Sequence, residues 1–544
     1  IANNTITGNC GWPGAGVCID AWGGGTTIVK DNIITGNVSD YYNDSNGGGI
    51  ACYGASCVIT GNTITNNVAS RQGGGVLLEC CENAVVVNNV IADNFVTGFT
   101  SAYSEPHLGG GIFVHGGRAL IANNTIVGNW SQSGEGGAIY CAEKLYGCDD
   151  DLETDVRIIN NIIAHNSSGV LKDGITPTIA NNCMWDNGSY DFKDRSGDPW
   201  APTGNLAADP DLASRQYGRW HIQPGSPCRD AGDDSVVQAQ WPDMDEQPRV
   251  QGAHVDIGAD ESDGTVWPEA PAIIRVSPGG SGNGSSWASP MGSVQAAIDA
   301  ASVQGGGEVW VKAGTYYERL NLRSYVDIYG GFSGVETTRD QRDWTTNVTT
   351  IDASGATAGR AVTAAGVKAT VDGFTLRNGT GGLDYIGYSS GGAVYACSSW
   401  LELANNVISN NSAEYYGGGV CYTSSGGSIR GNTIRDNTES GYGSGGGIYC
   451  SRSMLSIVGN VIAGNVGYMG GGIYADCAID IACNIIRGNQ AAQYCKGGGI
   501  CLEGSDKSYV VNNTIVENTC ANSGAGVYLS SGVTVFANNI VAYN

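Results

Sequence analysis

A six-residue pattern recurs along most of the chain, in the order Asn, a β-forming residue, Ile or Val, any two residues, Asn. Copies stand at 4–9, 32–37, 62–67, 89–94, 124–129, 161–166 and, in a weaker form, 182–187, and again at 406–411, 432–437, 460–465, 484–489, 513–518 and 539–544. A repeat with a period of a few tens of residues constrains the architecture more strongly than any local secondary-structure preference.

A second pattern, two or three small residues of the Gly-Gly-Gly type followed by Ile or Val, alternates with the first. In the second half of the chain successive Gly patterns stand 25 to 28 residues apart. That spacing is too short for a strand-helix-strand unit, and the segments lack the apolar periodicity of a helix. The repeat therefore predicts an all-β fold, a parallel β-solenoid.

In such a coil the Ile or Val of each motif points inward, and we expect these side chains to form one continuous aliphatic stack. Asn at the corners can hydrogen-bond its own backbone, tolerate left-handed geometry and stack in ladders, and Gly permits tight bends and close backbone approach. The residues expected in the stack include Ile6, Ile34, Ile64, Ile91, Ile126, Ile434, Ile462, Ile486 and Ile515.

The paired motifs, clearest as ITGN at 6–9 and GGAI at 136–139, resemble the repeats of chlamydial polymorphic outer membrane proteins. More broadly they are similar to right-handed parallel β-helices of the pectate lyase type. The resemblance covers most of 1–190 and 370–544. It implies a right-handed β-helix but does not specify a chemistry, because one fold hosts many functions.

The chain predicts two β-helix modules in tandem. Residues 205–261 hold no repeat and resemble the closing segment of bacterial surface β-helix proteins, whereas 275–318 resembles the opening of a pectate-lyase-type helix, with a short amphipathic capping helix at 292–303. We therefore expect a first module at 1–204, the closing segment at 205–261, a linker at 262–274, the opening cap at 275–318 and a second module at 319–544. Both modules are expected to be incomplete.

The charge balance limits the partners. The chain has 27 Lys and Arg against 52 Asp and Glu, a formal net charge of −25, which repels the phosphates of nucleic acids and anionic membrane surfaces. No run of 18 apolar residues exists, so the chain is not expected to span a membrane. Eighteen Cys favour an oxidising compartment, which predicts an extracellular or cell-surface location.

One aromatic column is a candidate binding surface. If the residue after each Gly motif points inward, the next one points outward, which predicts an exposed column of Tyr140, Tyr395, Tyr449, Tyr474 and Tyr528. Such a column could stack on sugar rings or contact a neighbouring fibre. Alternatively, Tyr simply suits the surface of a strand.

The cysteines divide by the same alternation, which places Cys52, Cys141 and Cys450 inward. Sequence proximity makes disulfides possible for Cys52–Cys57, Cys141–Cys148 and Cys477–Cys483. A zinc site is the alternative, but the chain contains no CxxC pair and only 5 His.

An acidic run after Cys148 is the candidate metal site. Its carboxylates, from Asp149, Asp150, Asp151, Glu153 and Asp155, are hard oxygen ligands of the kind that Ca²⁺ prefers. A solvated loop explains the run equally well, because the spacing is not that of an EF-hand. Apart from Ca²⁺, no cofactor is expected.

Two functions remain open. The first is a structural or adhesive extracellular solenoid that binds a polysaccharide, a cell surface or, end to end, other copies of itself in a fibre. The second is a carbohydrate-active enzyme, most simply a Ca²⁺-assisted polysaccharide lyase. Residues 276–544 contain no His, and the nearest basic grouping, His115 with Arg118, is loose. With charged residues at only 15%, the sequence favours the first function and predicts no catalytic residue.

Overall fold

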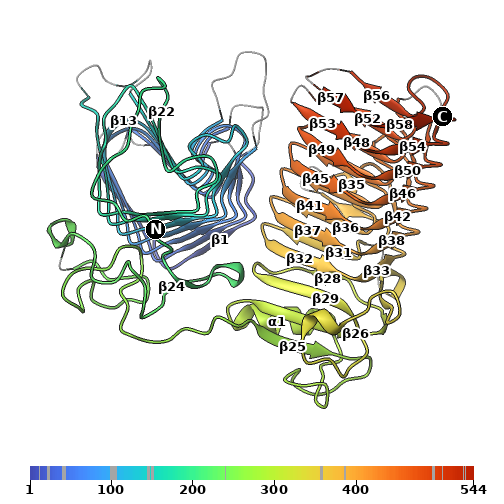
Figure 1. The fold of residues 1–544 in the computed structure, drawn as a ribbon, viewed down its shortest axis with the longest axis horizontal. Coiled ribbons are helices and arrows are strands. Elements are labelled where there is room, and N and C mark those ends of the chain that lie inside the picture. Colours follow the sequence, from blue (N-terminus) through green and yellow to red (C-terminus); the bar gives the residue numbers. More distant parts are fainter. Residues whose placement is uncertain are drawn as a thin grey trace. The chain divides into compact units, whose positions relative to one another are not determined.

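The computed structural model covers residues 1–544 and describes all of them except residues 12, 21–24, 40–44, 55, 98–106, 144–147, 149–151, 239, 356–358, 385, 386, 493–495, 505, 506, 531 and 533. The chain divides into two compact units, which we call unit 1 (Ile1–Ala270) and unit 2 (Pro271–Asn544). Each unit is a coil of stacked parallel strands, as predicted (Figure 1).

In unit 1 the strands of successive turns pair in parallel. A seven-stranded sheet contains β1 (Thr5–Thr7), β4 (Ile33–Thr35), β8 (Thr63–Thr65), β11 (Val90–Ala92), β14 (Thr125–Val127), β18 (Ile162–Ala164) and β21 (Cys183–Trp185). An eleven-stranded sheet contains β2 (Val17–Asp20), β6 (Ile50–Tyr53), β10 (Val76–Val87), β13 (Ile112–Ala122), β16 (Ile139–Ala142), β19 (Val170–Asp173) and β22 (Phe192–Asp194), with β3 (Thr26–Lys30), β7 (Ser56–Thr60), β17 (Asp155–Ile159) and β20 (Thr178–Ala180). A four-stranded sheet completes the coil, with β5 (Val38–Ser39), β9 (Val68–Ala69), β12 (Phe95–Val96) and β15 (Trp130–Ser131).

Unit 2 repeats the arrangement. Its ten-stranded sheet contains β25 (Ala272–Val276), β26 (Gly307–Lys312), β29 (Val326–Phe332), β32 (Lys368–Asp372), β37 (Trp400–Ala404), β41 (Gly426–Arg430), β45 (Met454–Val458), β49 (Ile479–Ala482), β53 (Ser508–Val511) and β57 (Thr534–Ala537). Its nine-stranded sheet contains β27 (Gly314–Tyr316), β30 (Thr349–Asp352), β33 (Phe374–Arg377), β38 (Val407–Ser409), β42 (Thr433–Arg435), β46 (Val461–Ala463), β50 (Ile485–Arg487), β54 (Thr514–Val516) and β58 (Ile540–Ala542).

The third side of unit 2 carries two more parallel sheets. One has eight strands, β28 (Leu320–Asn321), β31 (Val362–Ala365), β36 (Val394–Cys397), β40 (Val420–Thr423), β44 (Ile448–Ser451), β48 (Ile473–Ala475), β52 (Ile500–Leu502) and β56 (Val527–Leu529). The other has five, β39 (Ser412–Ala413), β43 (Thr438–Glu439), β47 (Val466–Gly467), β51 (Gln490–Ala491) and β55 (Thr519–Cys520). A small antiparallel pair, β34 (Gly382–Leu383) with β35 (Ser389–Ser390), projects from one turn.

The two Asn of each motif build hydrogen-bonded ladders along the coil. At each step the backbone N–H and the side-chain Nδ2 of one Asn donate to Oδ1 of the Asn one turn later, as Asn32 does to Asn62 at 3.0 and 2.9 Å. The ladder side chains are mostly buried, and buried amides need such partners. In unit 2 the ladders run through Asn406, Asn432, Asn460, Asn484, Asn513 and Asn539, and through Asn411, Asn437, Asn465, Asn489, Asn518 and Asn544.

The residue before a ladder Asn makes the bend. Asp31, Asn66 and Asn88 have φ of 54°, 54° and 58°, and Gly occupies the same position in other turns. A left-handed backbone conformation costs the least conformational energy for Gly, Asn and Asp, which explains why these residues are found there. At the Gly motif the reason is different, because a Cβ on Gly49 would lie 2.5 Å from the carbonyl oxygen of Gly75 on the next turn.

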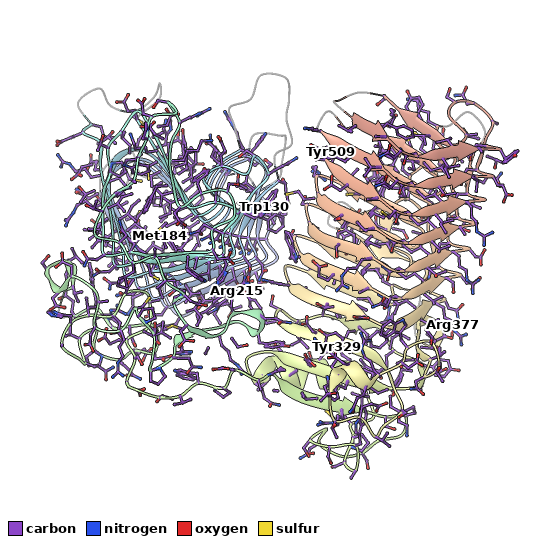
Figure 2. All side chains as sticks on the ribbon, viewed as in Figure 1. Trp130, Met184, Arg215, Tyr329, Arg377 and Tyr509 are labelled. Carbon is purple, nitrogen blue, oxygen red and sulfur yellow. A yellow bond between two sulfur atoms is a disulfide. The ribbon has the colours of Figure 1, made fainter. Side chains whose placement is uncertain are left out.

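The predicted aliphatic stack is confirmed. In unit 1 the register joins Ile6, Ile34, Ile64, Ile91, Ile126, Ile163 and Met184, and in unit 2 it joins Ile408, Ile434, Ile462, Ile486 and Ile515. Nearly all of these side chains are fully buried. Figure 2 shows Met184 inside the coil of unit 1, whereas Tyr509 and Arg377 extend from strands of unit 2.

After β22 the regular stacking stops and the chain folds along the side of unit 1. The segment begins with an antiparallel pair, β23 (Leu212–Ser214) and β24 (Arg219–Ile222), which flank the 3₁₀ helix η1 (Arg215–Tyr217) and precede the 3₁₀ helix η2 (Asp234–Val236). Gly258 rests on Ile162, since a Cβ at Gly258 would lie 2.6 Å from Cδ1 of that residue. The backbone N–H of Ala259 donates to Oγ1 of Thr125 at 3.1 Å. This segment therefore covers the outer face of β14 and β18.

Unit 2 opens with strand β25 and helix α1 (Val294–Val303). The four predicted inward residues of the helix, Val294, Ala297, Ile298 and Ala301, are buried in the core of unit 2, so the amphipathic helix is confirmed. Glu318 holds the start of the helix by accepting from the backbone N–H of Val294 and Gln295, both at 3.0 Å. Strand β25 starts at Ala272, within the range 262–274 that the sequence assigned to a linker. Two more 3₁₀ helices, η3 (Arg339–Gln341) and η4 (Ala353–Gly355), lie in connections of unit 2.

Candidate functional site

The predicted tyrosine column exists as a line of residues but is not exposed. Strand register joins Tyr395, Cys421, Tyr449, Tyr474, Cys501 and Tyr528 across the eight-stranded sheet. The exposed fractions of Tyr395, Tyr449 and Tyr474 are only 5%, 9% and 8%, and burial raises the pKa of each phenol. In unit 1 Tyr140 is 4% exposed and stacks on Phe113 at 4.9 Å. The prediction of a solvent-facing column is therefore wrong for these four, and Tyr528 is half-buried.

Loop side chains cover the column. Tyr416 and Met469 pack against it, and the ring centroids of Tyr416 and Tyr449 are 4.6 Å apart. The strand alternation predicted correctly that the column points away from the aliphatic core. It could not show that loops from the turn corners fold over the column.

The loops themselves carry the exposed aromatic surface. Tyr388, Tyr415, Tyr442 and Tyr468, which we call the tyrosine ridge, precede four residues that are bridged in register on consecutive turns: Ser390, Tyr416, Ser444 and Met469. Tyr442 is 83% exposed, Tyr388 is 39% exposed and the other two are half-buried. Rings of Tyr388 and Tyr415 lie 4.7 Å apart, and those of Tyr442 and Tyr468 lie 5.6 Å apart.

Glu439 fixes one half of the tyrosine ridge. One carboxylate oxygen accepts from the backbone N–H of Gly441 and Gly443, on both sides of Tyr442, at 2.7 and 3.2 Å. The other accepts from the N–H of Tyr468 at 2.6 Å. Burial raises the pKa of this carboxyl although the three backbone donors oppose the shift. A buried acid therefore fixes the backbone that carries Tyr442 and Tyr468.

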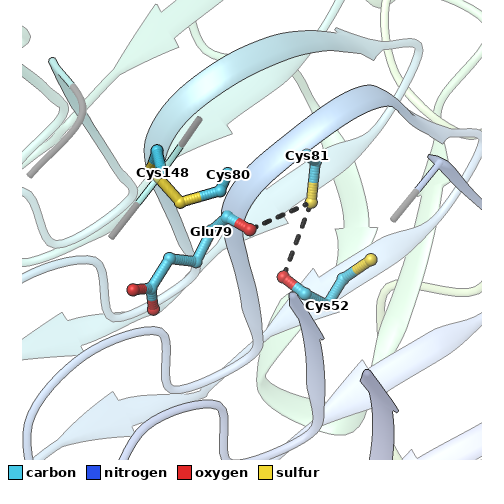
Figure 3. The surroundings of a disulfide bond; sticks show 5 residues. All are labelled: Cys52, Glu79, Cys80, Cys81 and Cys148. Carbon is cyan, nitrogen blue, oxygen red and sulfur yellow. Dashed lines mark hydrogen bonds between the residues drawn. A yellow bond between two sulfur atoms is a disulfide. The ribbon is translucent and has the colours of Figure 1, made fainter. Parts of the chain in front are cut away.

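The described cysteines form one disulfide, Cys80–Cys148, which joins residues 68 positions apart (Figure 3). The expected Cys141–Cys148 pair is therefore wrong, and Cys141 is a buried thiol in the core of unit 1. Cys477 lies beside Cys450, with 3.1 Å between the two Sγ atoms, while Cys483 is exposed. The expected Cys477–Cys483 bond is not formed.

Cys52 and Cys57 belong to a buried group of three. Their Sγ atoms and that of Cys81 all lie within 4.8 Å of one another. The possible Cys52–Cys57 disulfide is not formed between these two described residues, although their Sγ atoms lie close together. Figure 3 shows the thiol of Cys81 directed at the carbonyl of Cys52, at 3.5 Å. The inward placement of Cys52, Cys141 and Cys450 is confirmed, since all three lie in the aliphatic cores.

The acidic run lies largely outside the described residues. Of its members, Asp149, Asp150 and Asp151 fall in the part that the structure does not describe. Glu153 forms an ion pair with Arg118 at 2.6 Å, and Asp155 begins β17, paired in register with Arg118. The calcium site therefore stays a prediction. Arg118 of the basic grouping pairs with Glu153, and His115 is 5% exposed beside Phe113.

A polar cluster that the sequence analysis missed lies in the segment after β22. His221, Asp245 and Asp260 each bring one potential ligand atom within 4.8 Å of the others, and Nε2 of His221 lies 2.9 Å from Oδ2 of Asp245. Burial raises the pKa of Asp260 to about 6, and burial also raises that of the neighbouring Glu261 to about 7. Burial lowers the pKa of His221, but the hydrogen bond to Asp245 and the surrounding carboxylates outweigh it, so the pKa is raised.

No helix in the described part of the chain combines the length and apolar character needed to cross a membrane.

Two family models match separate parts of the chain. One described as "Right handed beta helix region" matches residues 1–144, and one described as "Periplasmic copper-binding protein (NosD)" matches residues 357–544. A search of curated proteins found no match. The predicted resemblance to right-handed β-helices is thus confirmed at the level of the fold.

Among solved structures, a PL6 family alginate lyase, AlyGC, matches with 14% identity and a TM-score of 0.29. The match covers 99% of this chain and 77% of the lyase chain. A mutant of the same enzyme matches with 13% identity; the match covers 99% of this chain and 77% of the other, with a TM-score of 0.28. Likeness at these TM-scores carries no conclusion about activity. The chain therefore contains two β-helix regions, the first similar to the right-handed β-helix model and the second similar to the NosD model.

Proposed function

We propose that this protein is an adhesive β-solenoid that works outside the cytoplasm and binds neutral polysaccharide along the tyrosine ridge. The observation that carries the proposal is the placement of four partly exposed tyrosines on consecutive turns of unit 2. The described disulfide and the periplasmic description of the family model that matches unit 2 support an oxidising, extracytoplasmic location.

The repeat of the coil suits a repeating ligand. Parallel strands in one sheet lie about 4.8 Å apart, so each turn advances the aromatic rings by a similar step. Aromatic faces offer sugars a broad apolar contact, and a tyrosine adds a hydroxyl group at its edge. A linear chain of sugar rings can therefore contact several tyrosines at once, and weak contacts on one chain reinforce each other.

Charge narrows the ligand class. The formal net charge of −25 repels polysaccharides rich in carboxylate or sulfate, at least over distances comparable to the screening length. Glu414, beside Tyr415, is exposed and can accept hydrogen bonds from sugar hydroxyls. We therefore expect neutral glycans such as β-glucans or chitin oligosaccharides.

Calorimetric titration of the full chain with soluble β-glucan and chitin oligosaccharides tests the proposal, with polygalacturonate as the acidic comparison. Changing Tyr415→Ala and Tyr442→Ala together should weaken neutral glycan binding by about tenfold. Tyr509→Ala is the matched control, because Tyr509 is also a partly exposed tyrosine of unit 2 but lies on β53, away from the tyrosine ridge. The proposal fails if neutral glycans do not bind, or if the double variant binds them as the parent protein does.

The remaining functional expectations stay predictions. End-to-end association into a fibre would appear as filaments in electron micrographs of the purified protein. The Ca²⁺-assisted lyase alternative would appear as unsaturated sugar products formed from a uronate polymer only when Ca²⁺ is present.

A further inference from the structure

Three side chains that are far apart in the sequence meet in the segment that covers unit 1. His221 lies on β24, Asp245 on the loop after Pro242, and Asp260 near the end of the segment. Their ligand atoms all lie within 4.8 Å of one another. Asp260 is 3% exposed, the His221 side chain is 15% exposed and that of Asp245 is 33% exposed. The cluster is therefore mostly buried, with one side toward solvent.

Each ligand is positioned by its own contacts. Asp260 accepts from the backbone N–H of Ile222 at 2.9 Å, which fixes it beside the histidine. The loop of Asp245 is ordered by Asp243, whose carboxylate accepts from the N–H of Asp245 and Gln247 at 2.9 and 2.7 Å. The ring of Trp267 stacks on His221 with 3.7 Å between the centroids. Such second contacts are what a preorganised binding site requires.

The cluster has more negative than positive charge. Asp243, Asp256 and Glu261 are buried close to Asp260. They face one buried cation, Arg249, which lies 4.0 Å from Glu261 and donates its hydrogen bonds to the backbone carbonyls of Ala259, Asp256 and Gly258. A single buried cation offsets only part of the charge of these carboxylates, and the excess negative charge is costly to bury. The nitrogen of His221 that faces Asp245 is Nε2, at 2.9 Å from Oδ2, while Nδ1 is buried and has no hydrogen-bond partner among the described residues.

We propose that His221, Asp245 and Asp260 form a binding site for a divalent cation of the zinc type. One imidazole nitrogen and two carboxylates are a donor set that Zn²⁺ accepts, and three protein ligands leave a fourth position for water. Ca²⁺ fits less well, because it takes six to eight oxygen ligands. The cation neutralises excess charge and joins β24 to two loops of the segment that covers unit 1.

Titration of the chelator-treated full chain with Zn²⁺ alone tests this site. The parent protein should bind one Zn²⁺ that is lost, or weakened at least about tenfold, in His221→Gln and in Asp260→Asn. His254→Gln is the matched control, because His254 also pairs with an aspartate, Asp234, at 3.0 Å, but the described residues bring no third ligand to it. Zn²⁺ should also raise the melting temperature of the parent and the control, but not of the two variants.

The outcomes separate the alternatives. If Asp260→Asn does not fold, as judged by circular dichroism, Asp245→Asn replaces it, because Asp245 lies toward solvent. Absence of saturable Zn²⁺ binding, or unchanged binding in the His221 and carboxylate variants, overturns the proposal and leaves His221 and Asp245 as an ion pair only. Binding that is lost in Cys81→Ser but kept in His221→Gln also overturns it, since the metal would then sit on the thiols of Cys52, Cys57 and Cys81.

Independently of the cation site, two buried thiols of unit 2 lie close together. Cys450 on β44 and Cys477, just before β49, are 0% and 4% exposed, and their Sγ atoms are 3.1 Å apart. A disulfide needs a sulfur-sulfur distance of about 2.05 Å, so the atoms must approach by about 1 Å. The geometry points to a Cys450–Cys477 disulfide that joins consecutive turns.

The bond forms during folding, before the two thiols are buried, by thiol-disulfide exchange with a small-molecule or protein disulfide. One thiolate attacks the oxidant to give a mixed disulfide and release one thiol; the second thiolate then displaces the other thiol and closes the Cys450–Cys477 bond. Two cysteine thiols are oxidised and one external disulfide is reduced to two thiols. The oxidant is the kind that oxidising compartments supply.

Mass spectrometry of non-reduced peptides tests the bond, after the full chain has been refolded in the presence of oxidised glutathione and its remaining thiols have been alkylated under denaturing conditions. We expect a linked Cys450–Cys477 peptide alongside the linked Cys80–Cys148 peptide, with Cys141 alkylated as the control for a buried thiol. Alkylation of both Cys450 and Cys477 in a sample where Cys80–Cys148 is linked overturns the inference. A Cys477–Cys483 link would overturn it as well.

Discussion

Ile162 in unit 1 and Ile485 in unit 2 occupy the same position in copies of the same motif, NIIAHN and NIIRGN, yet their surroundings differ. Ile162 is 0% exposed and Ile485 is 44% exposed, while the next residues, Ile163 and Ile486, are both fully buried. The motif therefore determines what lies inside the coil in both units. What lies outside is decided by the non-repetitive segment, which covers β18 with Gly258.

The sequence could predict features that depend on the repeat or on one helix turn, but not those made by irregular segments. Periodicity predicted the aliphatic stack and the helix at 292–303 because each depends on residues close together in the repeat or in one helix turn. It predicted the direction of the tyrosine column but not its cover, which comes from loops around Tyr416 and Met469. The cluster of His221, Asp245 and Asp260 could not be predicted, because its members come from three irregular stretches that meet only in the folded chain.

The largest expected effect comes from breaking an Asn ladder. Asn465 is 0% exposed; its Nδ2 donates to the carbonyl of Ile434 at 2.9 Å, and its Oδ1 accepts from the N–H and Nδ2 of Asn437. Asn465→Ala leaves several buried groups without partners, at about 1–3 kcal/mol each, so the free energy of unfolding of unit 2 should fall by about 3–6 kcal/mol. Denaturant unfolding measures this loss.

Asn4→Ala is the control for that prediction. Asn4 makes the same ladder contact, with Asn32, but is exposed, so its partners can reach water. Its replacement should reduce stability by about 1 kcal/mol or less. Equal losses in the two variants would mean that the ladder is not a buried hydrogen-bond network.

The next largest effect distinguishes the covered face of unit 1, at Ile162, from the exposed face of unit 2, at Ile485. Ile162→Ser places a hydroxyl in the covered interface and removes buried apolar surface, which should destabilise unit 1 by about 2–4 kcal/mol. Ile485→Ser changes an exposed side chain and should alter the stability of unit 2 by about 0.5 kcal/mol or less. Calorimetry of both variants measures the difference. Similar changes in melting temperature, each measured for its own unit against the parent protein, would disprove the cover over β18.

A smaller effect should appear as a dependence on pH in metal-free protein. Burial raises the pKa of Asp260 to about 6 and of Glu261 to about 7, and the pKa of His221 is also raised. For each group the folded state holds its proton more tightly than the unfolded chain, so this stabilisation is complete at low pH and is lost as pH rises through the folded pKa. Unit 1 should therefore melt a few degrees lower at pH 8 than at pH 5.

The matched pair for the pH prediction is Glu261→Gln against Asp234→Asn. The first removes a group with a raised pKa and should flatten the decline between pH 5 and pH 8. The second removes a group whose pKa is lowered by the backbone N–H of Val255 and by His254, and should leave the decline unchanged. Thermal melts in chelator-containing buffers compare them. A decline that persists in Glu261→Gln, Asp260→Asn and His221→Gln would assign the pH dependence elsewhere.

The central claim is that one repeat builds both coils while a non-repetitive segment covers one face of unit 1. Covalent footprinting of the native full chain with a carbene reagent, read residue by residue by mass spectrometry, tests it most directly. We predict strong labelling of Ile485 and no labelling of Ile162, with Ile163 and Ile486 both protected as internal references. Comparable labelling of Ile162 and Ile485 would contradict the claim.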